Sequence, residues 1–154
     1  MSAARLNADN RLNGAAHPAG IAVTDDDYEF TFDIWSRSNN CAAADIIHGA
    51  GRKIWGLVYE IPDRLIRRDT AAPDKSLDAI EAEGTNYQRV EIRLRWPDGR
   101  AITGAVLTYA GLDRRQGIRT STAYVQHIPV GGGVGRISCA PGLRPLRSST
   151  DSDE

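Results

Sequence analysis

The chain has 154 residues, of which 41% are hydrophobic and 25% are charged, and its formal net charge at pH 7 is −1. This length and composition fit one globular domain with a sizeable core and leave little room for a second complete domain. A nucleic-acid or anionic-membrane partner would favour a strong excess of basic residues, so the nearly balanced charge argues against both.

Segments for membrane insertion or secretion are not evident in the sequence. No stretch approaches the roughly 20 apolar residues that span a bilayer, and the opening "MSAARLNADNRLNG" lacks the apolar core of a signal peptide. We therefore expect a cytoplasmic protein. Cys41 and Cys139 lie far apart without paired spacing, which favours two thiols over a disulfide.

The first third of the chain predicts one helix followed by strands. Ala3, Leu6 and Leu12 are roughly helically spaced, which predicts a helix over residues 2–12. After the acidic turn "TDDD", apolar and polar residues alternate through "FTFDI", as in a half-buried strand. We expect a second strand in "CAAADII".

The middle of the chain predicts a central strand and two short helices. The nearly continuous apolar run "IWGLVYEI", residues 54–61, indicates a strand covered on both faces. Pro62 suits the first turn of a helix over "DRLIRRD". A second helix over "LDAIEAE" is expected to be capped by Ser76 and ended by a left-handed Gly84.

The next elements are a hairpin and a last helix. In "YQRVEIRLRW" apolar residues alternate with charged ones, "PDGR" is a tight turn, and "AITGAVLTYA" returns antiparallel. "STAYVQHI" predicts a helix. From Gly131 onward periodicity is lost, so we expect a domain over residues 1–130 and a flexible tail over 131–154. This order of elements predicts an α+β fold with a mixed, strongly curved sheet or partial β-barrel.

Residue patterns alone give no strong catalytic site. His17, His48 and His127 have no neighbours at metal-ligand spacing, so no metal site is expected. No Gly-x-Ser-x-Gly elbow is present, and "GGGVGR" lacks the lysine-serine ending of a phosphate loop. The carboxylates of "EAEG", Glu81 and Glu83, are typical of a solvated helix end.

Three segments together resemble the gamma-glutamylcyclotransferase-like superfamily, and they occur in the family's order. "KIWGLVYEIP" is similar to its "VWGVVYEL" strand, "LDAIEAEGTNYQRVEI" to its "LD..EG...Y.R..V" segment, and "STAYVQHI" to its "PS..Y...I" segment. The resemblance covers roughly residues 1–128 and implies the family's curved α+β fold.

The resemblance also implies site residues. In that family the glutamate immediately before the glycine is the catalytic acid/base, which implies Glu83 here and leaves Glu81 as an ordinary surface residue. Tyr124, Ser121 and Tyr87 match motif positions, and these three with Gly84 are implied as substrate-binding residues.

The implied reaction needs no metal or organic cofactor. The free α-amine of a small γ-glutamyl substrate attacks its own γ-amide carbonyl and releases 5-oxoproline plus an amine or amino acid. The nucleophile is part of the substrate, so the protein has to orient it and move a proton. The identity of the γ-glutamyl compound and the oligomeric state are not implied.

The beginning of the chain departs from the family pattern. Family members open with a strand and a "YGSN" loop whose backbone amides bind substrate, whereas "MSAARL" matches the residues that follow this loop. Two interpretations remain open: the true start lies upstream, or the chain is a shortened relative. The alternative function is therefore a non-catalytic small-molecule-binding or regulatory domain of the same fold.

Overall fold

The computed structural model describes residues 3–69, 75–128 and 137–139, and strands dominate this part of the chain. Its helical elements are single turns: α1 (Ala3–Leu6), the 3-10 helix η1 (Asp63–Leu65), α2 (Leu77–Ile80) and α3 (Thr122–Val125). The strands are β1 (His17–Thr24), β2 (Tyr28–Ser36), β3 (Cys41–His48), β4 (Trp55–Glu60), β5 (Tyr87–Ile92), β6 (Leu94–Arg95), β7 (Val106–Gly111) and β8 (Ile137–Cys139).

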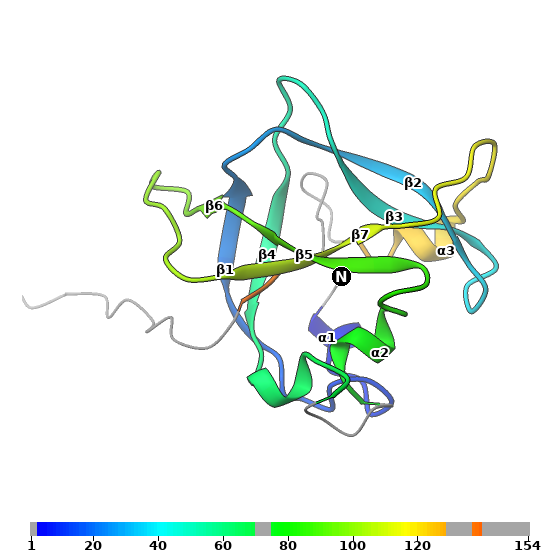
Figure 1. The fold of residues 1–154 in the computed structure, drawn as a ribbon, viewed down its shortest axis with the longest axis horizontal. Helices are drawn as coiled ribbons and strands as arrows, with labels where there is room; N and C mark the ends of the chain where they lie inside the picture. The colour runs from blue at the N-terminus through cyan, green and yellow to red at the C-terminus, as the bar shows by residue number, and fades with distance from the viewer. Residues whose placement is uncertain (1–2, 70–74, 129–136, 140–154) are drawn as a thin grey trace, which may run out of the picture.

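The main sheet is mixed and strongly curved. Its strand order is β5-β7-β8-β4-β1-β6, and β4 and β8 are parallel while the other neighbours are antiparallel. Only Arg93 separates β5 from β6, yet these two strands are at opposite ends of the order, so the sheet must bend back on itself. Figure 1 shows β1 and β4 running across the direction of β5 and β7. The predicted α+β class with a curved mixed sheet is confirmed.

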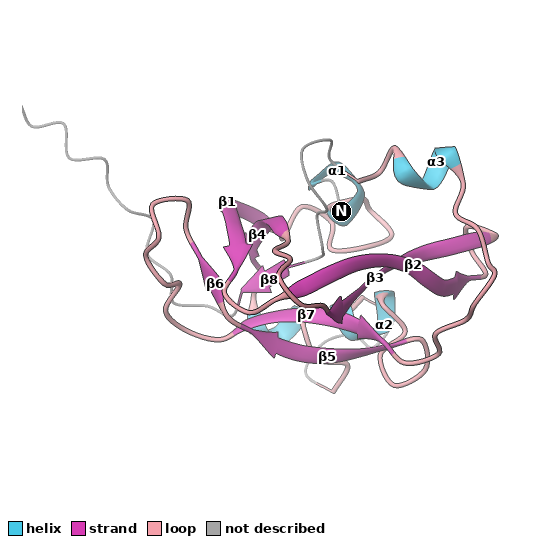
Figure 2. Ribbon diagram, turned by 90° about the horizontal axis from the view of Figure 1, so that it is seen from above, coloured by secondary structure: helices cyan, strands magenta, loops and turns pink. Residues whose placement is uncertain are grey.

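The second sheet is a long ribbon of β2 and β3 that packs against the main sheet. Figure 2 shows this ribbon between α3 and the β5–β7 pair. Its buried Asp45 accepts hydrogen bonds from Gly111 N at 2.6 Å and from Arg114 Nε at 2.7 Å. A side chain at Gly111 would collide with Ile34 and Asp45, so glycine permits this close approach. The ribbon is thereby fixed to the end of β7.

The strands predicted from alternation are present, whereas all four predicted helices are shorter than predicted. The helix expected over residues 2–12 stops at Leu6 because the Asn7 side chain bonds both backbone groups of Ala16, at 2.8 and 2.9 Å. These bonds close a loop instead of continuing the helix. The expected helix after Pro62 is reduced to η1. Strands β1 and β8 were not predicted, and the rest of the expected tail lies outside the described residues.

Helix α2 is held at both ends. Ser76 caps it as predicted, since its side chain accepts a hydrogen bond from Ala79 N at 3.2 Å. The buried carboxylate of Asp78 accepts hydrogen bonds from Tyr109 Oη on β7, at 2.6 Å, and from Arg89 Nη1 on β5. The hydrogen bond with Asp78 raises the pKa of Arg89. A one-turn helix is thus fixed to two strands by one side chain.

No described helix combines the length and the apolar character that a membrane crossing needs.

Replacement of Asp78 by Ala should lower the free energy of unfolding by about 3 kcal/mol, because it leaves a mostly buried guanidinium and a buried hydroxyl without their partner. Chemical denaturation measures the change. As a matched control, Asp98→Ala removes a carboxylate that pairs with Arg100 at the surface and should barely change the melting temperature. Equal effects of the two substitutions would contradict the anchoring role of Asp78.

Asp33 predicts a pH-dependent stability. It lies at the irregularity between Phe32 and Ile34, and its Oδ1 is buried without a hydrogen-bond partner among the described residues. Desolvation, and secondly the charge of Asp45, raise the pKa of Asp33. The folded state therefore holds this proton more tightly, and stability falls as pH rises from about 3.9 through the raised pKa.

Replacement of Asp33 by Asn should accordingly raise the melting temperature at neutral pH, because the isosteric amide removes the buried charge. The gain should shrink as pH approaches about 4, where the aspartate of the wild type takes up its proton. Thermal unfolding of both proteins across this range tests the prediction. A gain that is constant with pH would mean that the charge of Asp33 is not its source.

Candidate active site

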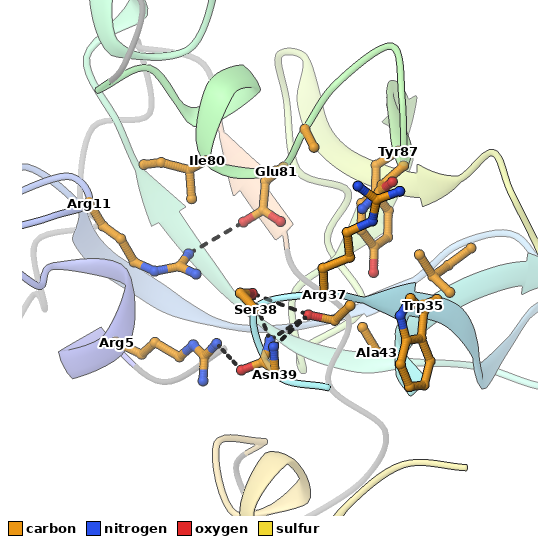
Figure 3. A pocket seen from close by; sticks show the side chains of 14 residues that line it. Arg5, Arg11, Trp35, Arg37, Ser38, Asn39, Ala43, Ile80, Glu81 and Tyr87 are labelled. Atoms are coloured by element: carbon orange, nitrogen blue, oxygen red, sulfur yellow. Dashed lines mark hydrogen bonds and ion pairs between the residues drawn. The ribbon is translucent and has the colours of Figure 1, made fainter. Parts of the chain in front are cut away.

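A cavity of about 260 Å³ lies where the β2–β3 ribbon meets the N-terminal segment and the residues after α2 (Figure 3). This volume is near the lower end of the roughly 300–1,000 Å³ typical of small-molecule sites. The polar and charged residues that line it are Arg5, Arg11, Ser36, Arg37, Ser38, Asn39, Glu81, Asn86 and Tyr87. The cavity therefore suits a small polar ligand.

Glu81 is the carboxylate in the cavity wall. It is the C-cap residue of α2, and its backbone N–H donates to Leu77 O at 2.9 Å. Only 4% of the residue is exposed, and its Oε1 lies 3.7 Å from Arg11 Nη1. Figure 3 shows these two side chains pointing toward each other. The prediction that Glu81 is a surface residue is wrong.

Three guanidinium groups share the cavity with this carboxylate. Arg11 pairs with Glu81, Arg5 donates to Asn39 Oδ1 at 3.1 Å, and Arg37 lies on the turn that joins β2 to β3. Burial, and secondly the charge of Arg5, lower the pKa of Arg11. The excess of positive charge favours a ligand that carries an anionic group.

Glu83 and Gly84 lie in the turn between α2 and β5. Glu83 is half-buried, its backbone N–H donates to Asp78 O at 2.8 Å, and it is not among the residues that line the cavity. Gly84 has a φ of 84° and is left-handed as predicted, but the helix ends earlier than expected, and Ala82 also has a positive φ of 51°. The turn therefore leaves Glu81 in the cavity wall and Glu83 outside it.

The other predicted site residues have clear structural contacts. Tyr87 lines the cavity, and its hydroxyl donates to Ala44 O at 2.8 Å. The Tyr124 hydroxyl accepts from Ala44 N at 3.1 Å, and Ser121 caps α3 by accepting from Tyr124 N at 3.1 Å. Tyr87 is thus the one predicted site residue that lines this cavity, and the roles of all five in catalysis or substrate binding remain predictions.

Sequence reasoning missed Glu81 although a signal for it was present. The family segment "LD..EG" places its glutamate four residues after the leucine, which is Glu81 when counted from Leu77. The same segment places it directly before the glycine, which is Glu83. Two extra residues separate these positions in this chain, and the assignment made from the sequence followed the glycine. In the structure, Glu81 is buried and lines the cavity, whereas Glu83 is half-buried and does not line it.

The described part of the chain contains no group of three or more His, Cys, Asp or Glu side chains that could hold a metal ion. The chemical groups that the cavity offers are one carboxylate, guanidinium groups and polar side chains. They can bind a zwitterion and can exchange a proton with it.

Comparisons with solved structures show the fold. An uncharacterized protein from Homo sapiens superposes with a TM-score of 0.60 at 18% identity, over 75% of this chain and 64% of that one. A structure described as a gamma-glutamyl cyclotransferase also gives a TM-score of 0.60, at 16% identity, over 80% and 67% of the two chains. The chain thus spans 64% of the length of the first. No curated protein sequence matches it.

The model of the family described as "Gamma-glutamyl cyclotransferase, AIG2-like" matches residues 6–126. The matched range includes the strands β1 to β7 and most of the residues that line the cavity. The chain therefore belongs to the AIG2-like gamma-glutamyl cyclotransferase family.

Proposed function

We propose that the protein is a γ-glutamyl cyclotransferase that acts on a small γ-glutamyl compound and uses Glu81 as its general acid/base. The observation that carries this proposal is the buried carboxylate of Glu81 in the wall of a small, arginine-rich cavity. Family membership supports the reaction class. The resemblance in sequence implied Glu83 instead, and this remains the competing assignment.

Substrate binding follows from the charges of the cavity. The γ-glutamyl head carries an α-ammonium and an α-carboxylate. The ammonium is attracted to Glu81, while the carboxylate is attracted to the guanidinium groups of Arg5 and Arg11. Both ends of the head are then held in one small cavity, which restricts the chain to the folded shape that ring closure requires.

The reaction then needs two protons to leave the α-nitrogen, because the α-ammonium becomes the single N–H of the product ring. The α-ammonium gives a proton to the Glu81 carboxylate, and the free amine forms a bond with the γ-carbonyl carbon to close a five-membered ring. As the C–N bond of the γ-amide breaks, Glu81 returns the proton to the departing nitrogen, and the ring nitrogen loses its second proton to the solvent. The products are 5-oxoproline and an amine or amino acid, and the carboxylate is regenerated.

Replacement of Glu81 by Gln should lower the rate of 5-oxoproline release about 10²- to 10⁴-fold, which is the usual contribution of a general acid/base. Glu83→Gln is the matched control and should be nearly silent. Release is measured on a panel of γ-glutamyl compounds, and thermal melting checks that both variants fold.

The opposite pattern, with Glu83→Gln inactive and Glu81→Gln active, would restore the assignment made from the sequence. Binding of γ-glutamyl compounds without any 5-oxoproline release by the wild type would instead support the non-catalytic binding domain. The cytoplasmic location expected from the sequence remains a prediction alongside this proposal.

Tyr124→Phe distinguishes a structural from a substrate-binding tyrosine. Because the hydroxyl accepts from the Ala44 N–H, its removal should lower the free energy of unfolding by about 1–2 kcal/mol. KM should change little, since Tyr124 does not line the cavity. Denaturation and steady-state kinetics measure the two quantities. A large rise in KM at unchanged stability would support the substrate-binding role that the resemblance implied.

A further inference from the structure

Arg37 differs from the other arginines of the cavity because no described residue forms an ion pair or hydrogen bond with its guanidinium. Arg11 lies against Glu81 and Arg5 against Asn39. Arg37 is exposed, and no side chain in the described part of the structure forms an ion pair or hydrogen bond with its guanidinium. In Figure 3 its side chain extends from the β2–β3 turn toward Tyr87. An accessible cation thus stands at the outer part of the cavity.

The turn that carries Arg37 is well held. The Ser36 hydroxyl accepts hydrogen bonds from Asn39 N at 3.3 Å and from Asn39 Nδ2 at 2.6 Å. Asn39 in turn accepts the hydrogen bond from Arg5. The backbone of Arg37 is therefore fixed relative to Arg5. Less backbone entropy is then lost when the side chain of Arg37 binds a ligand.

A bound γ-glutamyl head has two charged groups, and neither of them needs Arg37 as its partner. The α-ammonium is matched by Glu81, and the α-carboxylate by Arg5 and Arg11, which are partly buried whereas Arg37 is exposed. With about 260 Å³ available, the head occupies the inner part of the cavity and the departing amine extends outward. The group that Arg37 can reach is therefore on the departing amine, and an arginine at this position favours an anion.

We infer that Arg37 is a specificity residue that favours γ-glutamyl compounds whose departing amine carries a carboxylate, such as an amino acid or peptide, over those that release a neutral or cationic amine. This inference rests on the proposed cyclotransferase function. In this view, the cavity selects its substrate by the charge of the departing amine.

Two substrates that differ by one carboxylate test the inference. γ-Glutamyl-alanine and γ-glutamyl-ethylamide have the same head, and their departing amines differ by the carboxylate of alanine. For the wild type, the specificity constant kcat/KM should be about two- to fivefold higher for γ-glutamyl-alanine, the modest preference expected of a solvent-accessible charge pair. The release of 5-oxoproline measures both rates, and salt should reduce the preference.

Arg37→Gln should remove the preference by lowering kcat/KM for γ-glutamyl-alanine alone, while Arg37→Glu should reverse it. The matched control is Arg64→Gln, which removes the charge of an exposed arginine of η1 that does not line the cavity. This control should leave both rates unchanged. A wild-type preference that survives Arg37→Gln, or no preference at all, would overturn the inference.

Failure of the proposed function gives a different result. If the wild type releases 5-oxoproline from neither compound, the catalytic proposal fails, and calorimetric binding of the two compounds then decides the role of Arg37. Tighter binding of γ-glutamyl-alanine that is lost in Arg37→Gln would support recognition of the carboxylate. Equal binding by both proteins would reject it.

Discussion

The candidate site depends on the buried carboxylate of Asp78. Helix α2 is a single turn, which is too short to be stable by itself. Asp78 connects it to β7 through Tyr109 and to β5 through Arg89. Glu81 follows three residues later, nearly one helical turn, so the hydrogen bonds of Asp78 also determine the position of Glu81. A loss at Asp78 would therefore displace the carboxylate that we propose as catalytic, although Asp78 itself does not line the cavity.

The wall of the cavity that the β2–β3 ribbon forms depends on a second set of buried polar contacts. The N–H and C=O of Ala44 on β3 bind the hydroxyls of Tyr124 and Tyr87, and the neighbouring Asp45 binds the end of β7. Ribbon residues thus keep their backbone groups satisfied without a third strand. Because the ribbon is fixed along β3, the turn with Arg37 is held close to the segment that carries Glu81.

The sequence predicted the elements whose signal is local. Alternation identified β2 and β5, a continuous apolar run identified β4, and a serine three residues before Ala79 identified the cap of α2. Strand β8 lies in a glycine-rich segment without periodicity, so its pairing with β4 and β7 depends on tertiary contacts that the pattern does not contain. The site was harder to predict, because the residues that line it come from three separate segments and the sequence does not show which of the two glutamates is buried.

The shortened first helix and the charged cavity have one cause. In a continuous helix over residues 2–12, Arg5 and Arg11 would be six residues apart, or roughly 240° around the axis, and would face different directions. The bonds between Asn7 and Ala16 close the segment into a loop after α1. Arg5 and Arg11 then line the same cavity, and Arg11 lies against Glu81. The side chain of Asn7 competes with the backbone hydrogen bonds of the helix, and the resulting loop places two arginines near the proposed acid/base.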